Sequence, residues 1–256
     1  MTNNVFGSVD LVEILFTLFW LFFAVLVLYL HRESKREGYP LVGEGGGTSV
    51  VRGFPAPPDV KTYKLAHGGT VTVPRPVDDY ELAAESVAPI PGAPIVPTGD
   101  PLVDGVGPAA WSNRQDTPDL TLHGKPRIVP MRTQPGFHVD SRDPDPRGMS
   151  VISADGENIG TVTDAWIDIP EPMIVYIEVA LNEVAGSGNI LIPFAFADLK
   201  AASNSIVVDA LLAKQFGNAP RLKDADTITL LEEDKVCGYF GGGKLLATPE
   251  RSEPLI

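Results

Sequence analysis

A run of twenty mostly apolar residues near the start of the chain constrains its fold more than any other feature. Residues 11–30 read LVEILFTLFWLFFAVLVLYL, in which Glu13 is the one charged residue. A helix of about 20 residues, rising roughly 1.5 Å per residue, spans the hydrocarbon layer of a bilayer, which is about 30 Å thick. We therefore expect residues 11–30 to form a transmembrane helix.

The flanks of this run predict that the helix is retained and which way it crosses the membrane. A cleavable signal peptide has a basic start and a shorter apolar run, whereas residues 1–10 contain no Lys or Arg. The segment HRESKREG follows the run and carries Arg32, Lys35 and Arg36. Because basic residues concentrate on the cytoplasmic side, we expect residues 1–10 outside and everything after His31 in the cytoplasm.

Tyr29 and Arg32 fall where the predicted helix leaves the hydrocarbon layer. An aromatic ring and a basic head at that depth can hold a lipid headgroup. The simpler alternative is ordinary anchoring at the interface, without a particular lipid. We predict a lipid or interface site at these two residues.

The composition of the chain limits its partners. The 256 residues carry a formal net charge of -13. Nucleic-acid binding needs clustered Lys and Arg, so we expect proteins, lipids or protons as partners and no nucleic acid. Cys237 is the only cysteine, which excludes an intrachain disulfide. We expect it to be a small buried residue.

Proline content divides the rest of the chain. Residues 53–110 contain 11 of the 24 prolines. Proline fixes φ and removes a hydrogen-bond donor, which disfavours regular helices and central strands. We predict an extended strap here, with a short hairpin at residues 63–73 around Gly68 and Gly69.

From about Gly148 onward, strand-like runs alternate with turns. Asp155 and Gly156 separate two extended segments, a strong hairpin signal. The runs MIVYIEVAL, NILIPF, SIVVDA and DTITLL follow, with one short helix expected at residues 209–216. Strands at this spacing predict a small antiparallel barrel. The expected fold class is a single N-terminal transmembrane α-helix plus a mainly-β domain.

The sequence carries few signals for catalysis or for metal binding. The GGGK run at residues 241–244 lacks the spacing and the trailing Ser or Thr of a phosphate loop. The four histidines show no metal-ligand spacing. We therefore predict no catalytic residue, no metal site and no cofactor bound directly by this chain.

Two acidic stretches stand out. Asp168 and Glu171 flank a proline at the end of an apolar strand pattern. Carboxylates at partly buried positions can relay protons, although these two could instead only cap a solvated turn. Residues 232–235, with the sequence EEDK, are most simply a charged edge or a docking patch.

Six motifs follow one another along the chain. They are REGYPL (36–41), LAHGGTVTVP (65–74), PTGDPLVDGVGPAAW (97–111), KPRIVPMR (125–132), DPDPRGM (143–149) and LLEEDKVCGYFGGGKLLATPER (230–251). Together with the predicted anchor, they resemble the H subunit of the photosynthetic reaction centre of purple bacteria, whose cytoplasmic domain includes a PRC-barrel.

The resemblance implies a division of the chain. Residues 1–10 would be periplasmic and residues 11–30 transmembrane, in the bacterial inner (intracytoplasmic) membrane. Residues 31–110 would form the basic interface segment and the strap. Residues 111–147 would connect them, packed on partners, to a cytoplasmic β-barrel domain with a C-terminal tail at residues 148–256.

The resemblance also implies partners and a role. The partners would be the L and M subunits and membrane lipids, with room for a cytochrome subunit and a light-harvesting antenna. The complex would hold bacteriochlorophyll, bacteriopheophytin, quinones, a non-haem iron and a carotenoid. This chain, not itself an enzyme, would stabilise the L/M core and cap the quinone sites on the cytoplasmic side. It would also help deliver protons to the secondary quinone during light-driven cyclic electron transport.

Three residues match the proton-transfer positions of the resembled family. Asp168 and Glu171 match its Asp-x-x-Glu acids near the proton path, and His123 matches the first histidine of a surface pair implicated in proton entry. The sequence departs from the pattern of some relatives at Lys125 (second histidine), Thr121 (an acid) and Val175 (an arginine). These departures argue against an entry built on two histidines. Another surface carboxylate, or the partner subunits, would then collect the protons.

The sequence is also compatible with two alternative functions. The chain could be a purely structural lid and scaffold of the same complex. It could also be a membrane-tethered PRC-barrel adaptor unrelated to photosynthesis.

Overall fold

The computed structural model describes residues 10–39, 41–42, 50–51, 53–73, 81–90 and 92–252. The chain divides into two compact units, Met1–Glu81 with Ser86–Pro94 and Leu82–Glu85 with Ile95–Ile256. The predicted periplasmic segment lies outside the described residues except for Asp10, as does the end of the predicted C-terminal tail.

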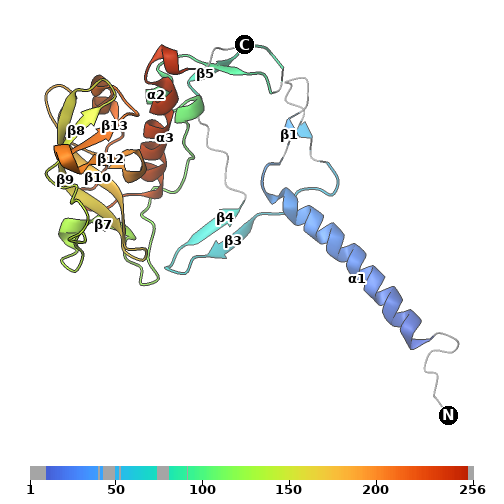
Figure 1. The fold of residues 1–256 in the computed structure, drawn as a ribbon. Coiled ribbons are helices and arrows are strands. Elements are labelled where there is room, and N and C mark those ends of the chain that lie inside the picture. Colours follow the sequence, from blue (N-terminus) through green and yellow to red (C-terminus); the bar gives the residue numbers. More distant parts are fainter. Residues whose placement is uncertain are drawn as a thin grey trace. The chain divides into compact units, whose positions relative to one another are not determined.

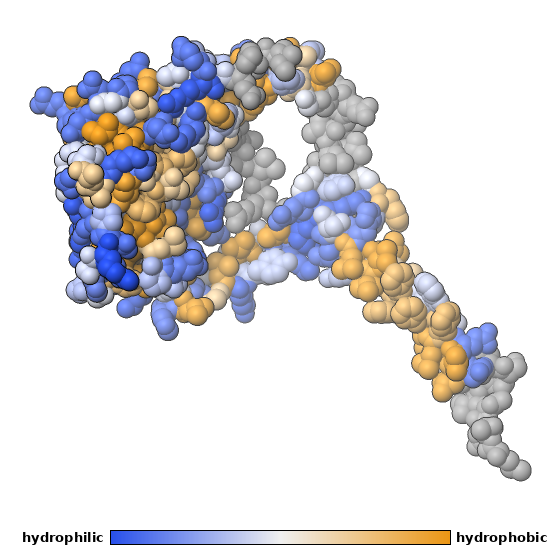
Figure 2. Space-filling view, in the orientation of Figure 1, coloured by the Kyte–Doolittle hydropathy of each residue, from blue (hydrophilic) through white to orange (hydrophobic). Residues whose placement is uncertain are grey.

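The first unit contains the predicted membrane helix, α1 (Leu11–Glu33) (Figure 1). The Asp10 side chain caps it by accepting a hydrogen bond from the Val12 backbone N–H. None of its residues is buried within the chain, and Figure 2 shows apolar side chains along its whole length. The stretch Leu11–Arg36 is long and apolar enough to cross a membrane. The predicted N-terminal helix is therefore confirmed.

Short elements follow α1 in the same unit. The 3-10 helix η1 (Ser34–Arg36) continues the chain from α1. Two antiparallel strand pairs come next: β1 (Leu41–Val42) with β2 (Val50–Val51), and β3 (Lys61–Lys64) with β4 (Thr70–Val73). The β3–β4 pair is the hairpin predicted at residues 63–73. Its turn contains Gly68 and Gly69, whose φ values of 92° and 83° favour glycine.

The proline-rich part contains only short elements among its described residues. β5 (Ala84–Ser86) pairs with β6 (Ile95–Pro97). The one-turn helix α2 (Pro101–Asp104) begins after Asp100, whose side chain accepts a hydrogen bond from the Leu102 N–H. The 3-10 turn η2 (Gly107–Ala109) follows. These lengths agree with the limits that proline places on helices and strands.

The second unit is built around a curled seven-stranded half-barrel sheet (Figure 1). Its strands are β7 (Ile128–Pro130), β8 (Ser150–Ser153), β9 (Asn158–Asp168), β10 (Met173–Leu181), β11 (Asn189–Pro193), β12 (Asp198–Lys200) and β13 (Ser205–Val208). The order is β11-β10-β9-β8-β13-β12, and β7 also pairs with β9. All of these pairs are antiparallel except β13 with β8. The expected mainly-β fold class is confirmed.

A 17-residue helix, α3 (Leu230–Leu246), completes the core of this unit. Phe240 of α3 packs against Phe216, with ring centroids 6.0 Å apart. Both belong to the main apolar cluster, together with Trp166 and Ile177 of the sheet. Further 3-10 turns are η3 (Met131–Thr133), η4 (Phe194–Phe196), η5 (Ala201–Ser203), η6 (Ala213–Asn218) and η7 (Pro249–Arg251).

The C-terminal part corrects three expectations. The DTITLL run is not a strand, because its last two residues begin α3. The helix expected at residues 209–216 is instead the 3-10 helix η6, and Cys237 of α3 is exposed rather than buried. A capping box starts α3: Thr229 Oγ1 accepts a hydrogen bond from the Glu232 N–H, and the Glu232 carboxylate accepts one from the Thr229 N–H.

The EEDK run at residues 232–235 makes contacts within the chain. Glu232 is buried in the capping box. Asp234 forms an ion pair with Arg114, with an N–O distance of 3.2 Å, and the Lys235 ammonium lies 4.5 Å from the centre of the Trp111 ring. These side chains fix the segment before the sheet onto α3, so the run is not a free docking patch.

Candidate functional site

The end of β9 positions the two predicted proton-transfer acids. Asp168 is the last residue of β9, and Glu171 lies in the short connection to β10. The Glu171 backbone N–H donates a hydrogen bond of 3.2 Å to Asp168 Oδ1. The turn between the two strands therefore orients both acids locally.

Arg127 joins these acids. Its Nε donates to Asp168 Oδ2 at 2.7 Å, and its Nη2 donates to Glu171 Oε1 at 2.9 Å. Its Nη1 also lies 3.7 Å from Asp119 Oδ2. The hydrogen bond to Asp168 and the surrounding negative charge raise the pKa of Arg127 above its ordinary value, so the guanidinium stays charged.

Strand register explains why Arg127 meets Asp168. Arg127 directly precedes β7, and β7 pairs with the end of β9 so that Ile128 lies opposite Asp168. The Ile169 N–H donates a hydrogen bond of 3.0 Å to the Arg127 carbonyl and extends this pairing by one step. The guanidinium is thus placed by the sheet.

The two acids differ in exposure. Asp168 is only 5% exposed, whereas the Glu171 side chain is 68% exposed. One guanidinium therefore links a carboxylate in water to a carboxylate within the protein.

His123 does not join this group. It is exposed at the tip of a loop whose two sides pair, since the Thr121 N–H donates to the Lys125 carbonyl at 2.8 Å. The same loop ends at Arg127, whose N–H donates to the Asp119 carbonyl. Within the described part of the chain, no hydrogen bond or ion pair connects His123 with either acid. The structure thus brings together two of the three predicted residues.

Tyr29 and Arg32, the predicted lipid or interface residues, are exposed near the end of α1. Arg32 Nη2 lies 4.0 Å from Asp59 Oδ2, and both of these side chains face solvent. An exposed ion pair of this length contributes little. The Tyr29 and Arg32 side chains thus stay accessible from outside the chain.

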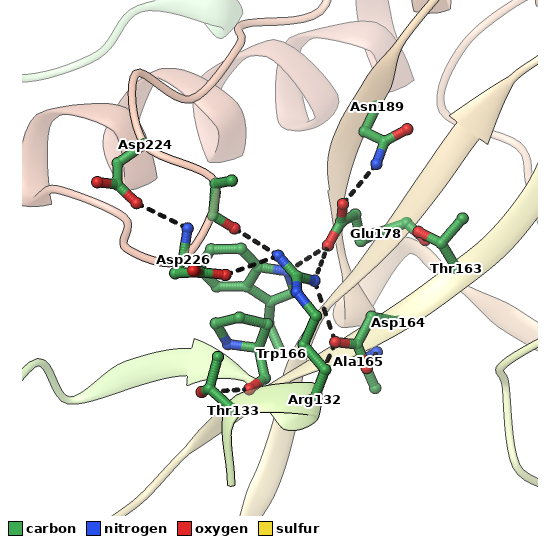
Figure 3. A network of polar contacts seen from close by, with 12 residues as sticks. Arg132, Thr133, Thr163, Asp164, Ala165, Trp166, Glu178, Asn189, Asp224 and Asp226 are labelled. Carbon is green, nitrogen blue, oxygen red and sulfur yellow. Dashed lines mark hydrogen bonds and ion pairs between the residues drawn. The ribbon is translucent and has the colours of Figure 1, made fainter.

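Sequence reasoning missed the arginines that organise the acids of the sheet. The available signal for Arg127 was a basic residue immediately before an apolar strand, in the motif KPRIVPMR. Arg132 of the same motif lies at the centre of a second network, with Asp164, Glu178 and Asp226 as its ion-pair partners (Figure 3). Among the described residues, no group of His, Cys, Asp and Glu has the arrangement of a metal site.

Glu233 of α3, in the acidic run at residues 232–235, is a further carboxylate with a polar contact inside the unit. The Tyr176 hydroxyl donates a hydrogen bond of 3.3 Å to Glu233 Oε2. Burial raises the pKa of Glu233 above its ordinary value of 4.5. Because the folded state prefers the protonated form, the contribution of Glu233 to stability is present below pH 4.5 and is lost as the pH rises through its folded pKa.

We therefore expect Glu233→Gln to stabilise the chain by about 1 kcal/mol at pH 8, because the amide removes a desolvated charge. Urea denaturation followed by tryptophan fluorescence measures the change. The gain should vanish at pH 4, where the wild-type carboxyl binds its proton. Glu183→Gln, at an exposed position, is the matched control and should change nothing. A gain that is equal at both pH values would contradict the assignment.

The fold and the site define the class of protein. Residues 138–215 match the sequence model of the PRC-barrel domain, which covers most of the half-barrel sheet. With α1, this makes the chain a PRC-barrel protein carrying one helix able to span a membrane. Residues 3–133, more than half of the chain, match the family described as photosynthetic reaction centre, H-chain N-terminal region. The chain belongs to the photosynthetic reaction-centre H-chain family.

Membership of this family supports several general conclusions about the chain. The H chain is a structural, non-enzymatic subunit, and its family implies association with the L and M subunits. The complex to which such a chain belongs carries pigments and quinones. The single apolar helix fits a single-pass membrane protein. The resemblance drawn from the six sequence motifs is confirmed.

Proposed function

We propose that this chain caps the quinone sites of the L/M core on the cytoplasmic side and helps deliver protons to the secondary quinone. The pair of acids bridged by Arg127 carries this proposal. A proton that moves from water toward a buried acceptor needs one group in water and another group inside the protein. Glu171 supplies the group in water and Asp168 supplies the group inside the protein. The Arg127 guanidinium binds both carboxylates.

The roles of the three residues follow from their exposure. His123, exposed at the loop tip, meets bulk water first. Glu171 accepts protons at the surface, and Asp168 passes them inward. Arg127 is a positioning residue, because it keeps the two carboxylates together without exchanging protons itself.

The membrane setting is part of the same proposal. The basic residues after α1 favour a cytoplasmic location for the bulk of the chain and a periplasmic N-terminus in the bacterial inner membrane. Bacteriochlorophyll, bacteriopheophytin, the quinones, the non-haem iron and a carotenoid would be held by the partner subunits. Tyr29 and Arg32 would contact lipid headgroups, and an antenna or a cytochrome subunit would be a further neighbour.

Glu171→Gln in the assembled complex should slow the second, proton-coupled reduction of the secondary quinone by about tenfold. The amide keeps the size of the side chain and accepts a hydrogen bond from Arg127, but it cannot take up and release a proton. Flash-induced absorbance changes measure the rate. Glu183→Gln, at an exposed position elsewhere in the same unit, is the matched control and should leave the rate unchanged.

The purely structural lid is the second candidate, and one observation favours it. Both acids form ion pairs with Arg127, which is sufficient reason for their presence in a stable fold. In that case Glu171→Gln would leave quinone turnover unchanged. Arg127→Gln would still lower stability, because it leaves the buried Asp168 carboxylate without its cation. Normal quinone turnover in the Glu171→Gln variant would therefore support the purely structural role.

A further inference from the structure

The β3–β4 hairpin is amphipathic. Its register places Tyr63 opposite Val71 and Lys64 opposite Thr70. Because successive side chains of a strand point to opposite faces, the eight strand residues separate into two sets. The apolar face carries Lys61, Tyr63, Val71 and Val73, and the polar face carries Thr62, Lys64, Thr70 and Thr72.

The apolar face is only partly covered within the described part of the chain, where Val71 and Val73 are half-buried and the residues of β3 are exposed. β3 and β4 pair only with each other there, and Tyr63 is 47% exposed. A two-stranded hairpin is at best marginally stable in water by itself. Contact of its apolar face with another apolar phase would add stability.

Ionic contacts tie the start of the hairpin to the end of α1. Lys61 Nζ donates a hydrogen bond of 3.1 Å to Glu33, the last residue of α1. Arg36 binds the same carboxylate through two nitrogens, and its Nη1 donates to the Asp59 carbonyl at 2.5 Å. These contacts keep the first residue of β3 beside the membrane helix.

The same contacts remove two basic residues from the surface. Arg36 is buried between Glu33 and Asp59, and Lys35 is buried with its ammonium bound to the Pro55 carbonyl at 2.8 Å. The basic residues that follow α1 in sequence are therefore not the ones that face the membrane. The positive charge that stays accessible beside the helix end lies on Arg32, Lys61 and Lys64.

The length of α1 sets the depth of this junction. Its 23 residues extend about 34 Å, slightly more than the roughly 30 Å hydrocarbon layer. Glu33 then falls at headgroup level, and so does the start of β3. Residues 60–73 contain two lysines, one histidine and no acid in a chain of net charge -13, which complements anionic headgroups.

We propose that the β3–β4 hairpin lies on the membrane surface as a second lipid contact beside α1. Its Tyr63 and Val71 face rests in the headgroup region, where tyrosine is enriched. Its Lys64 and Thr72 face points away from the hydrocarbon layer, and the long Lys64 side chain still reaches the headgroup phosphates. Phe54, which precedes β3 in the chain and is 85% exposed, offers a further apolar contact to lipid. The occupant of the apolar face is lipid rather than a partner protein.

Neighbouring residues on opposite faces give a sharp test. Tyr63→Cys and Lys64→Cys, each in a Cys237→Ser chain, carry a bimane fluorophore, and the full chain is placed in phosphatidylcholine nanodiscs with and without phosphatidylglycerol. At position 63 we expect severalfold weaker quenching by iodide and stronger quenching by nitroxide lipid than at position 64. Phosphatidylglycerol should enlarge the difference, and transfer to detergent should reduce it.

Two results would overturn the proposal. Equal iodide quenching at both positions in nanodiscs would place the hairpin in water. Position 63 could instead be protected from iodide only when the L and M subunits are present, and to the same extent in every lipid composition. That result would show that the apolar face contacts protein. Val71→Cys and Thr72→Cys repeat the comparison on β4, so the test does not depend on the hairpin tolerating the loss of Tyr63.

Discussion

Arg132→Gln is expected to lower the free energy of unfolding of the sheet unit by about 2–3 kcal/mol at neutral pH. Arg132 Nη1 donates to Asp164 Oδ2 at 3.1 Å and to Glu178 Oε2 at 2.6 Å (Figure 3). Both acids are buried. Removing the cation leaves two desolvated negative charges close together. The expected loss is below that of a fully buried pair because the Arg132 side chain is 40% exposed.

The network also joins segments that are far apart in sequence. Arg132 follows β7, and its Nη2 donates to the Ala225 carbonyl at 2.6 Å and to Asp226 at 3.0 Å, in the segment that leads to α3. Glu178 accepts further hydrogen bonds from the Trp166 indole and the Asn189 amide. Loss of Arg132 therefore loosens the contact between the sheet and the segment before α3.

The pH dependence of this loss has a definite sign. Burial by itself raises the pKa of Glu178, but the hydrogen bonds from Arg132, Trp166 and Asn189 outweigh it and hold the pKa below its ordinary value of 4.5. In the wild type, this stabilisation is present above pH 4.5 and is lost as the pH falls through the lowered pKa. Without Arg132, burial dominates and favours the neutral acid. The deficit of the variant should therefore shrink as the pH falls.

Arg142→Gln is the matched control. Arg142 also pairs with an aspartate, Asp140 at 3.0 Å, but its side chain is 87% exposed. An exposed pair of this kind contributes about 0–1 kcal/mol. Urea denaturation followed by tryptophan fluorescence compares the two variants, and Trp166 reports directly on the network. Equal effects of the two substitutions would show that Arg132 is an ordinary surface arginine.

Patterns of hydrophobicity were sufficient to predict the anchor and most of the sheet. The unbroken apolar run of α1 and the turn-bounded, strand-like runs of the sheet are each visible in the local sequence. Asp168 and Glu171 were also found, because they stand beside Pro170 at a strand end. These features lie within single segments, where sequence reasoning is strongest.

The partners of these acids could not be predicted in the same way. Arg127 meets Asp168 only because β7 pairs with the far end of β9, and no local pattern encodes that register. Arg132 likewise reaches Asp226 across 94 residues of sequence. Contacts of this kind depend on tertiary pairing. A single sequence therefore shows which residues are charged but not which of them form ion pairs.

The missed helix α3 has a different cause. Its capping box, Thr229 with Glu232, was visible in the sequence. The glycines at positions 238 and 241–243 lower helix propensity, so no helix was predicted here. In the structure, Gly242 and Gly243 are buried. Tertiary packing, rather than propensity, makes this segment helical.

Gly242→Ala is expected to destabilise the sheet unit by about 3 kcal/mol. A Cβ atom at this position would lie 2.5 Å from Ala109 Cβ, 2.7 Å from Ala109 Cα and 2.9 Å from its backbone nitrogen. These atoms belong to η2, which packs directly on α3. Backbone atoms cannot rotate out of the way as the end of a flexible side chain can. The η2 segment would therefore have to move away from the helix.

The adjacent glycine provides the control, with the opposite sign expected. A Cβ atom at Gly241 would meet only Phe196 Cζ, at an ordinary contact distance of 3.9 Å. Gly241→Ala should therefore stabilise α3 by about 0.5–1 kcal/mol through helix propensity alone. Urea denaturation of the two variants under identical conditions measures both changes. If both substitutions stabilised the chain, η2 would not pack on Gly242. If both destabilised it strongly, the run would need glycine for its backbone conformation, and the helical assignment of these residues would be wrong.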